Sequence, residues 1–130
     1  MFNTRNMSSG IRFAKATVNN VKGVILLPDN WAASIYTLNS TNGGNYSGNI
    51  ITIETWNIVL EANGAVFLPA AGYRNGTAVS YVGEQGCYWS ASFSDSSDVW
   101  RLYFESSNVF PNHSISRYRG HSVRLVRDAQ

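Results

Sequence analysis

Two stretches of the chain have the hydrophobic pattern of β-strands. Residues 24–27 form a continuous apolar run, Val-Ile-Leu-Leu, between Gly23 and Pro28. A short run without polar interruption predicts a strand that is buried on both faces. Residues 99–106 alternate instead, which predicts a strand with one core face and one exposed face. The core face would carry Trp100, Leu102 and Phe104, and the exposed face Arg101, Tyr103 and Glu105.

One helix is predicted over residues 52–62. Apolar side chains recur there at helical spacing, at Trp56, Val59 and Leu60. Thr52 can cap the first turn with its hydroxyl, and Asn63-Gly64 supplies a left-handed stop. The start and stop signals therefore agree with the periodicity between them.

The remaining pattern predicts short strands that are joined by polar loops. Strands are expected at residues 65–68, 88–92 and 122–126, with a hairpin around Asn75-Gly76. Trp89 is expected in the core, beneath the C-terminal strands. Residues 39–49 and 107–119 are predicted loops, and residues 11–16 fit a strand or a helical turn equally well. These elements predict one α+β domain at residues 23–130, preceded by an N-terminal arm at residues 1–22.

Composition and charge narrow the class of protein. Charged residues make up 14% of the chain, against roughly 25% in an average soluble domain, and 16 Ser and 14 Asn take their place. Residues 101–130 hold five arginines and no lysine, scattered among Ser and Tyr. A nucleic-acid surface usually clusters Lys and Arg densely, so no nucleic-acid partner is expected. No apolar run approaches the ~18 residues of a membrane span.

The motifs of common enzyme and metal sites are missing from the sequence. Cys87 is the single cysteine, which excludes an internal disulfide and a thiolate metal cage. His113 and His121 are the two imidazoles, and no pair of carboxylates accompanies them at metal-ligand spacing. We therefore expect no enzyme, no cofactor and no metal. The first residues also lack the apolar stretch of a signal peptide.

Aromatic residues in the last third of the chain indicate a binding surface instead. Four rings fall in predicted loops or opposite the predicted core face, at Phe93, Tyr103, Phe110 and Tyr118. Ser, Asn and Arg surround them. Large rings among small polar residues are typical of antibody-like binding surfaces, where rigid anchors sit among adaptable hydrogen-bonding groups.

Several segments of the chain resemble a bacterial family, the Fibrobacter-type major paralogous domain. They lie at residues 23–31, 62–74, 88–92, 102–104, 108–112 and 117–126. The resemblance implies a C-type-lectin-like fold of the formylglycine-generating-enzyme type, and a place on a bacterial cell surface or phage particle. Oxidases of that fold need a pair of cysteines, whereas this chain has Cys87 alone.

Domains similar to this family also serve as variable proteins of diversity-generating retroelements, which display altered residues for ligand capture. The resemblance implies display positions at Phe93, Asp95, Asp98, Arg101, Tyr103, Phe110, His113, Ser116, Tyr118 and His121. The expected partner is a macromolecular ligand, either a protein or a surface glycan. The alternative is a structural or adhesin module of a larger bacterial surface protein, with no variable site.

Overall fold

A computed structural model describes residues 12–39 and 45–125 of the chain. Residues 1–11 of the predicted arm, residues 40–44 of the predicted loop at 39–49, and residue 126 of the strand predicted at 122–126 lie outside the described residues. Within the described ranges, no helix combines the length and the apolar character that a membrane crossing requires.

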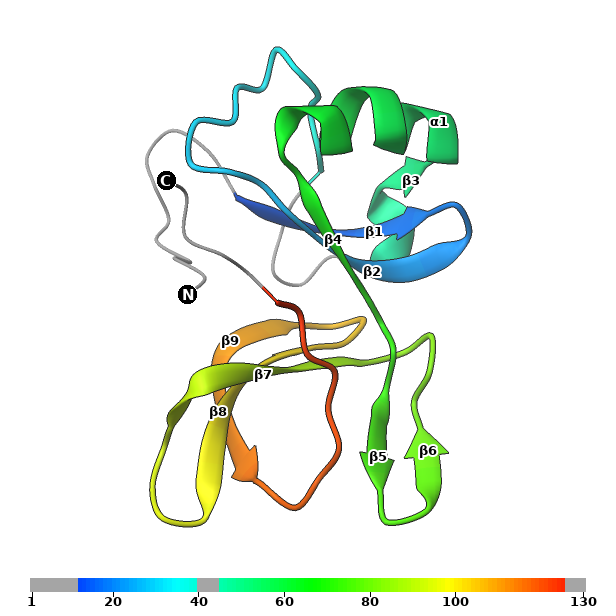
Figure 1. Ribbon diagram of the computed structural model, residues 1–130. Helices are drawn as coiled ribbons and strands as arrows, with labels where there is room; N and C mark the ends of the chain where they lie inside the picture. The colour runs from blue at the N-terminus through cyan, green and yellow to red at the C-terminus, as the bar shows by residue number, and fades with distance from the viewer. Residues whose placement is uncertain (1–11, 40–44, 126–130) are drawn as a thin grey trace.

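The N-terminal half forms a four-stranded sheet with the order β3-β1-β2-β4 (Figure 1). Its strands are β1 (Phe13–Val18), β2 (Val21–Leu26), β3 (Ile50–Ile51) and β4 (Val66–Pro69). β2 is antiparallel to both β1 and β4, whereas β3 is parallel to β1. Residues 11–16, which the pattern left undecided, therefore contribute a strand from Phe13 onward. The β1–β2 turn uses Asn19 and Asn20 at positive φ, a conformation that Asn tolerates well.

The predicted helix forms between β3 and β4, although only its first turn is α-helical. α1 (Ile53–Thr55) continues into a π-helical turn, η2 (Trp56–Leu60), and a 3-10 turn, η3 (Glu61–Asn63). Thr52 caps the start by accepting a hydrogen bond from the Thr55 amide, and Gly64 ends it at a φ of 88°. The predicted start and stop are thus confirmed.

The four-stranded sheet is covered on both faces. On one face, Ile25 packs with Trp56, Leu60 and the other members of a core cluster beneath the helix. On the other face, Val24 belongs to a second cluster that reaches the C-terminal sheet. The apolar run at residues 24–27 is therefore buried on both faces over Val24 and Ile25, as predicted.

The C-terminal half forms a three-stranded antiparallel sheet, β7-β8-β9 (Figure 1). Its strands are β7 (Gly86–Phe93), β8 (Asp98–Phe104) and β9 (Val109–Ser116). The predicted alternation in β8 is confirmed at Leu102 and Phe104, which are buried in the core cluster that also holds Tyr88 and Val109. Trp100, expected on the core face, is only half-buried, and Arg101, expected on the exposed face, is buried. Residues 107–119 were expected as a loop, yet 109–116 form β9.

Two smaller pieces complete the C-terminal half. The predicted hairpin is confirmed and joins β5 (Tyr73–Asn75) and β6 (Ala78–Ser80), but its turn residues are Gly76 and Thr77 instead of the predicted Asn75-Gly76. The segment after β9 pairs with β5 through Gly120 and with β7 through Ser122, by single bridges. The strand predicted at 122–126 is therefore reduced, within the described residues, to an isolated bridge at Ser122.

The predicted α+β class is wrong. The described chain is 46% strand and 13% helical, with one short helix and three small sheets, which is a mostly-β architecture. The expectation of an α+β, C-type-lectin-like fold is corrected accordingly. The physical reason is pairing between distant segments. The polar segment 109–116, which was expected as a loop, becomes the strand β9 because it pairs with β8.

Gly86 tests how tightly β7 packs against the core. A Cβ added at residue 86 would overlap the ring of Phe104, which is fully buried. We expect Gly86→Ala to lower the free energy of unfolding by about 1–3 kcal/mol, the usual effect of overpacking. The measurement is urea denaturation. Gly48→Ala is the control, because a Cβ there meets nothing within 4 Å. Equal midpoints for the two variants would contradict the close packing.

Candidate functional site

The C-terminal sheet has a second face, turned away from the four-stranded sheet, which we call the outer face. Because side chains alternate along a strand, the neighbours of the core residues Tyr88, Leu102 and Phe104 point to it. The cross-strand pairs confirm this placement: Cys87 lies opposite Tyr103, and Arg101 lies between Trp89 on β7 and His113 on β9. Chemically diverse side chains thus gather on the outer face.

Arg101 lies at the centre of the outer face. Arg101 is only 5% exposed. The guanidinium Nη1 lies 3.2 Å from Cys87 Sγ and 3.3 Å from His121 Nε2, and Nη2 lies 3.4 Å from His113 Nδ1. The guanidinium carbon is 4.6 Å from the centre of the Tyr103 ring, a cation–π distance.

Aromatic rings continue the outer face beyond Arg101. Tyr103 stacks on Phe110 with ring centres 5.7 Å apart, and His113 approaches both rings. Tyr103 also donates a hydrogen bond of 2.5 Å from its hydroxyl to Glu105 Oε2. The Tyr103 ring is therefore held from both sides, while Phe110 is 38% exposed and forms part of the surface.

The C-terminal segment covers the other side of Arg101. His121 packs on Trp89 with ring centres 4.1 Å apart, and its edge meets Tyr73 of the hairpin. Arg119 lies over Tyr73, with its guanidinium carbon 5.4 Å from the ring centre, and also approaches Tyr118. Single bridges tie Gly120 to β5 of the hairpin and Ser122 to β7, and they hold this cover in place.

Burial and positive charge set the protonation states on the outer face. Desolvation, reinforced by the charges of Arg101 and Arg119, lowers the pKa of His121 to about 4. Its contacts fit a neutral ring that donates from Nδ1 to the Gly120 carbonyl and accepts from Arg101 at Nε2. Burial raises the pKa of the Cys87 thiol in spite of the neighbouring Arg101. The site therefore presents arginine charge with a neutral thiol and a neutral imidazole.

The ten expected display positions separate into two groups. Five of them are brought into mutual contact on the outer face: Arg101, Tyr103, Phe110, His113 and His121. Four lie at the opposite end of the sheet, around the β7–β8 turn: Phe93, Asp95, Asp98 and Ser116. Tyr118 adjoins the first group through Arg119 and is 73% exposed.

The two acids at the turn have a local structural role. Asp95 Oδ1 accepts hydrogen bonds from the Ser97 and Asp98 amides and from the Ser97 hydroxyl, which lowers the pKa of Asp95. Ser97 also contacts Asp98. Phe93 is 71% exposed at the end of β7, so this turn offers a ring beside two carboxylates.

Sequence reasoning missed several outer-face residues. Trp89 was expected in the core, but it is half-buried on the outer face, because Tyr88 takes the core position and the next residue must point away. That alternation was a usable signal. Tyr73 and Arg119 carry no such signal, since a bridge between Arg74 and Gly120 brings their segments together.

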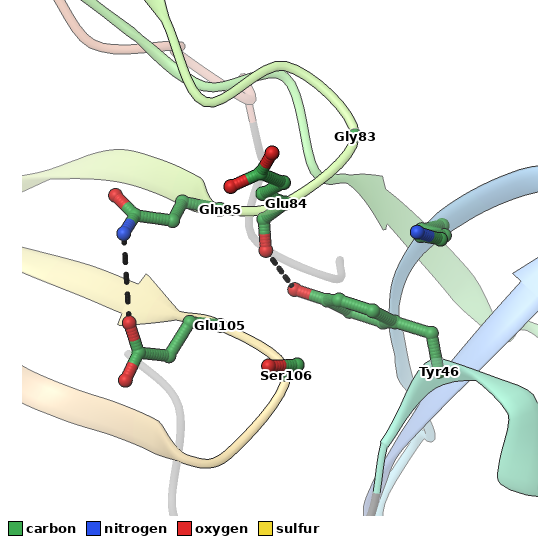
Figure 2. Close-up of a pocket in the computed structure, with 7 residues that line it drawn as sticks. Tyr46, Gly83, Glu84, Gln85, Glu105 and Ser106 are labelled. Atoms are coloured by element: carbon green, nitrogen blue, oxygen red, sulfur yellow. Dashed lines mark hydrogen bonds between the residues drawn. The ribbon is translucent and has the colours of Figure 1, made fainter.

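A polar cavity of about 280 Å³ lies near the same sheet (Figure 2). Its walls come from β2, η1 (Tyr46–Gly48), the loop before β7 and the end of β8. The lining residues are Lys22, Tyr46, Gly83, Glu84, Gln85, Glu105 and Ser106. The Tyr46 hydroxyl donates to the Glu84 carbonyl at 2.7 Å, and the Gln85 amide points at Glu105. The walls are therefore already bonded to one another.

Two charged side chains are held by their neighbours: Glu105 in the cavity wall, and Lys15, which is bonded to the wall residue Ser106. Hydrogen bonds from the Tyr103 and Ser107 hydroxyls lower the pKa of Glu105, so it stays ionised rather than acting as a general acid. Lys15 on β1 is buried and donates to the Ser106 carbonyl at 3.0 Å; desolvation lowers its pKa and Glu105 opposes that shift. Among the described residues, no group of three or more His, Cys, Asp or Glu could hold a metal ion.

Comparison with known proteins identifies the family of this mostly-β domain. Residues 35–126 match the model of a family described as a domain of unknown function (DUF8237). The match covers more than half of the chain, and the chain belongs to this family. No curated protein and no solved structure matches it.

The protonation of His121 can be measured directly. The unfolded chain takes up a proton at residue 121 near the usual pKa of 6.5, whereas the folded chain does so only near 4. The free energy of unfolding should therefore decrease as the pH falls through this window, and His121→Gln should remove that part of the decrease. NMR titration of the imidazole and urea denaturation at several pH values check both points. A midpoint near 6.5, or the same acid dependence in the variant, would contradict the assignment.

Proposed function

We propose that this chain is a non-enzymatic ligand-binding domain that holds a macromolecular ligand, a protein or a surface glycan, on the outer face of β7–β8–β9 and the loops beside it. The observation that carries the proposal is the convergence of Arg101, Tyr103, Phe110, His113 and His121 on one face of a sheet whose other face is occupied by the core. In a domain built for packing alone, the side opposite the core needs no such concentration of rings and arginines.

The composition of this face suits recognition. Phe110, Tyr118 and Arg119 lie at its accessible margin, and Tyr, Phe and Arg bury large areas at a small loss of side-chain freedom. Tyr103 is held from both sides by Phe110 and Glu105, so much of its conformational freedom is already lost before a ligand binds. Preorganisation of this kind favours affinity.

The chemistry of the same residues favours binding over catalysis. A nucleophile needs an accessible, activated atom and a base within reach. Cys87 is fully buried and its thiol pKa is raised, while the contacts of His121 already occupy both ring nitrogens. Glu105 is tied to two hydroxyls. Among Cys87, His121 and Glu105, no pair of nucleophile and base is therefore directed at solvent.

The proposal extends to variation of the face, in a variable protein of a diversity-generating retroelement on a bacterial surface or phage particle. Reading paralogous copies from one genome tests this extension. Differences concentrated at the ten display positions would support it. An even spread over exposed loops would favour the structural or adhesin module, because such a module has no reason to vary one face.

Tyr118 is the sharpest probe of binding, because it is exposed and makes no hydrogen bond through its side chain within the described structure. We expect Tyr118→Ala to weaken capture on an array of proteins and glycans by about 1–3 kcal/mol. Its thermal stability should stay within about 0.5 kcal/mol of the parent. Ile58→Ala, an exposed apolar residue on η2, is the control and should bind as the parent does.

Two outcomes would overturn this assignment. Equal capture by the parent, Tyr118→Ala and the Ile58 control would place the ligand elsewhere. Unfolding of Tyr118→Ala would show that the ring is structural. Tyr103→Ala is a poorer probe, since its ring supports Arg101 and Phe110, and its removal should reduce stability as well as binding.

A further inference from the structure

Two guanidinium groups on the outer face lack an acidic partner. Arg101 contacts a thiol, two imidazoles and an aromatic ring, and none of these groups is a carboxylate. Arg119 has the rings of Tyr73 and Tyr118 as its side-chain partners. Within the described ranges, the ion pair that the structure contains lies elsewhere, between Arg12 and Asp29.

Two carboxylates of the C-terminal half, those of Glu105 and Asp95, are already engaged by other donors. Glu105, which follows β8 and lies four residues after Arg101, accepts hydrogen bonds from the Tyr103 and Ser107 hydroxyls. Asp95 accepts from the turn amides at the far end of the sheet. A buried guanidinium without a nearby anion is unfavourable, because desolvation is not offset by an opposite charge. Burial lowers the pKa of Arg101, and the charge of Arg119 adds to that decrease.

The hydrogen-bonding capacity of both arginines is also incomplete. Nε of Arg101 and Nε of Arg119 are buried and have no hydrogen-bond partner within residues 12–39 and 45–125. In a guanidinium, Nε and the adjacent Nη form a planar edge that matches the two oxygens of a carboxylate. Among the described residues, the side chain of Arg119 is held by ring contacts, so it can rotate to turn its own Nε edge outward without breaking a hydrogen bond in the described structure.

We propose that the outer face binds a carboxylate of a peptide ligand between the guanidinium groups of Arg101 and Arg119. The inference rests on the proposed function and names the chemistry of its ligand. A peptide is favoured over an acidic sugar because the adjoining surface offers Phe110, a ring without polar atoms, and the exposed Tyr118. These rings offer apolar area that an apolar side chain next to an acidic residue can bury, whereas the hydroxyls of a sugar would each need a hydrogen-bond partner there.

The experiment uses small probes, so it does not need the natural ligand. Arginine Nε–H and backbone amide NMR signals of the full chain are followed while N-acetyl-glutamate N-methylamide is added at constant ionic strength. The glutamine analogue is the neutral control, and glucuronate and inorganic phosphate represent other anions. We expect saturable shifts of Arg101 and Arg119 with the glutamate probe, and at least tenfold weaker binding of the glutamine analogue.

A matched pair of variants locates the binding. Arg119→Gln should weaken binding of the glutamate probe at least tenfold. Arg117→Gln removes the same charge two residues away, from an exposed side chain that contacts the Ser96 carbonyl, and should change binding less than twofold. The comparison of the glutamate and glutamine probes on the parent chain remains decisive even if Arg119→Gln unfolds.

Three results would overturn the inference. They are the absence of saturable shifts with the glutamate probe, equal weakening by Arg117→Gln and Arg119→Gln, and tighter binding of glucuronate or phosphate than of the glutamate probe. None of them affects array capture that depends on Tyr118. Loss of that dependence, conversely, would remove the proposed function while leaving the small-probe result in place.

Discussion

Burial of one face of the β7–β8–β9 sheet against the four-stranded sheet is the constraint on which the C-terminal half depends. Phe104, Leu102 and Tyr88 fill that interface together with Val24 and Leu68. Once they are buried, the two-residue repeat of each strand places their neighbours on the opposite face of the sheet. The outer face is thus a consequence of the core, and its side chains are held by a rigid layer. Rigid support of this kind is what a binding surface requires.

The C-terminal segment covers part of the outer face, so Arg101 on this face is shielded from water. Two single bridges, at Gly120 and Ser122, bring the segment over Arg101. The guanidinium loses water there and gains no carboxylate as a partner; its contacts are a thiol, two imidazoles and the Tyr103 ring. A segment held by so few backbone pairs covers the most heavily desolvated charge of the sheet. The proposed binding would therefore be coupled to stability at this point, because both would depend on the position of this segment.

The sequence was most informative where local signals sufficed. Thr52 and Gly64 bracket the helix, and the apolar run through Val24 and Ile25 marks a strand between two cores. The alternation in β8 separated Leu102 and Phe104 from Arg101 and Tyr103, which the structure places on opposite faces. Applied one strand earlier, the same rule would have moved Trp89 to the outer face. These features depend on residues close in the chain, so a single sequence carries them.

Pairing between distant segments was decided only by the tertiary structure. β9 is polar and contains Pro111, and it becomes a strand because β8 supplies its hydrogen bonds. The strands β9 and β1, which the sequence pattern did not predict, change the fold class from the expected α+β to mostly β. The neighbours of Arg101 are settled in the same way, since Cys87, His113 and His121 come from three segments. By itself the sequence determined which residues could face outward. Which of them meet depends on long-range contacts, and no local pattern records those.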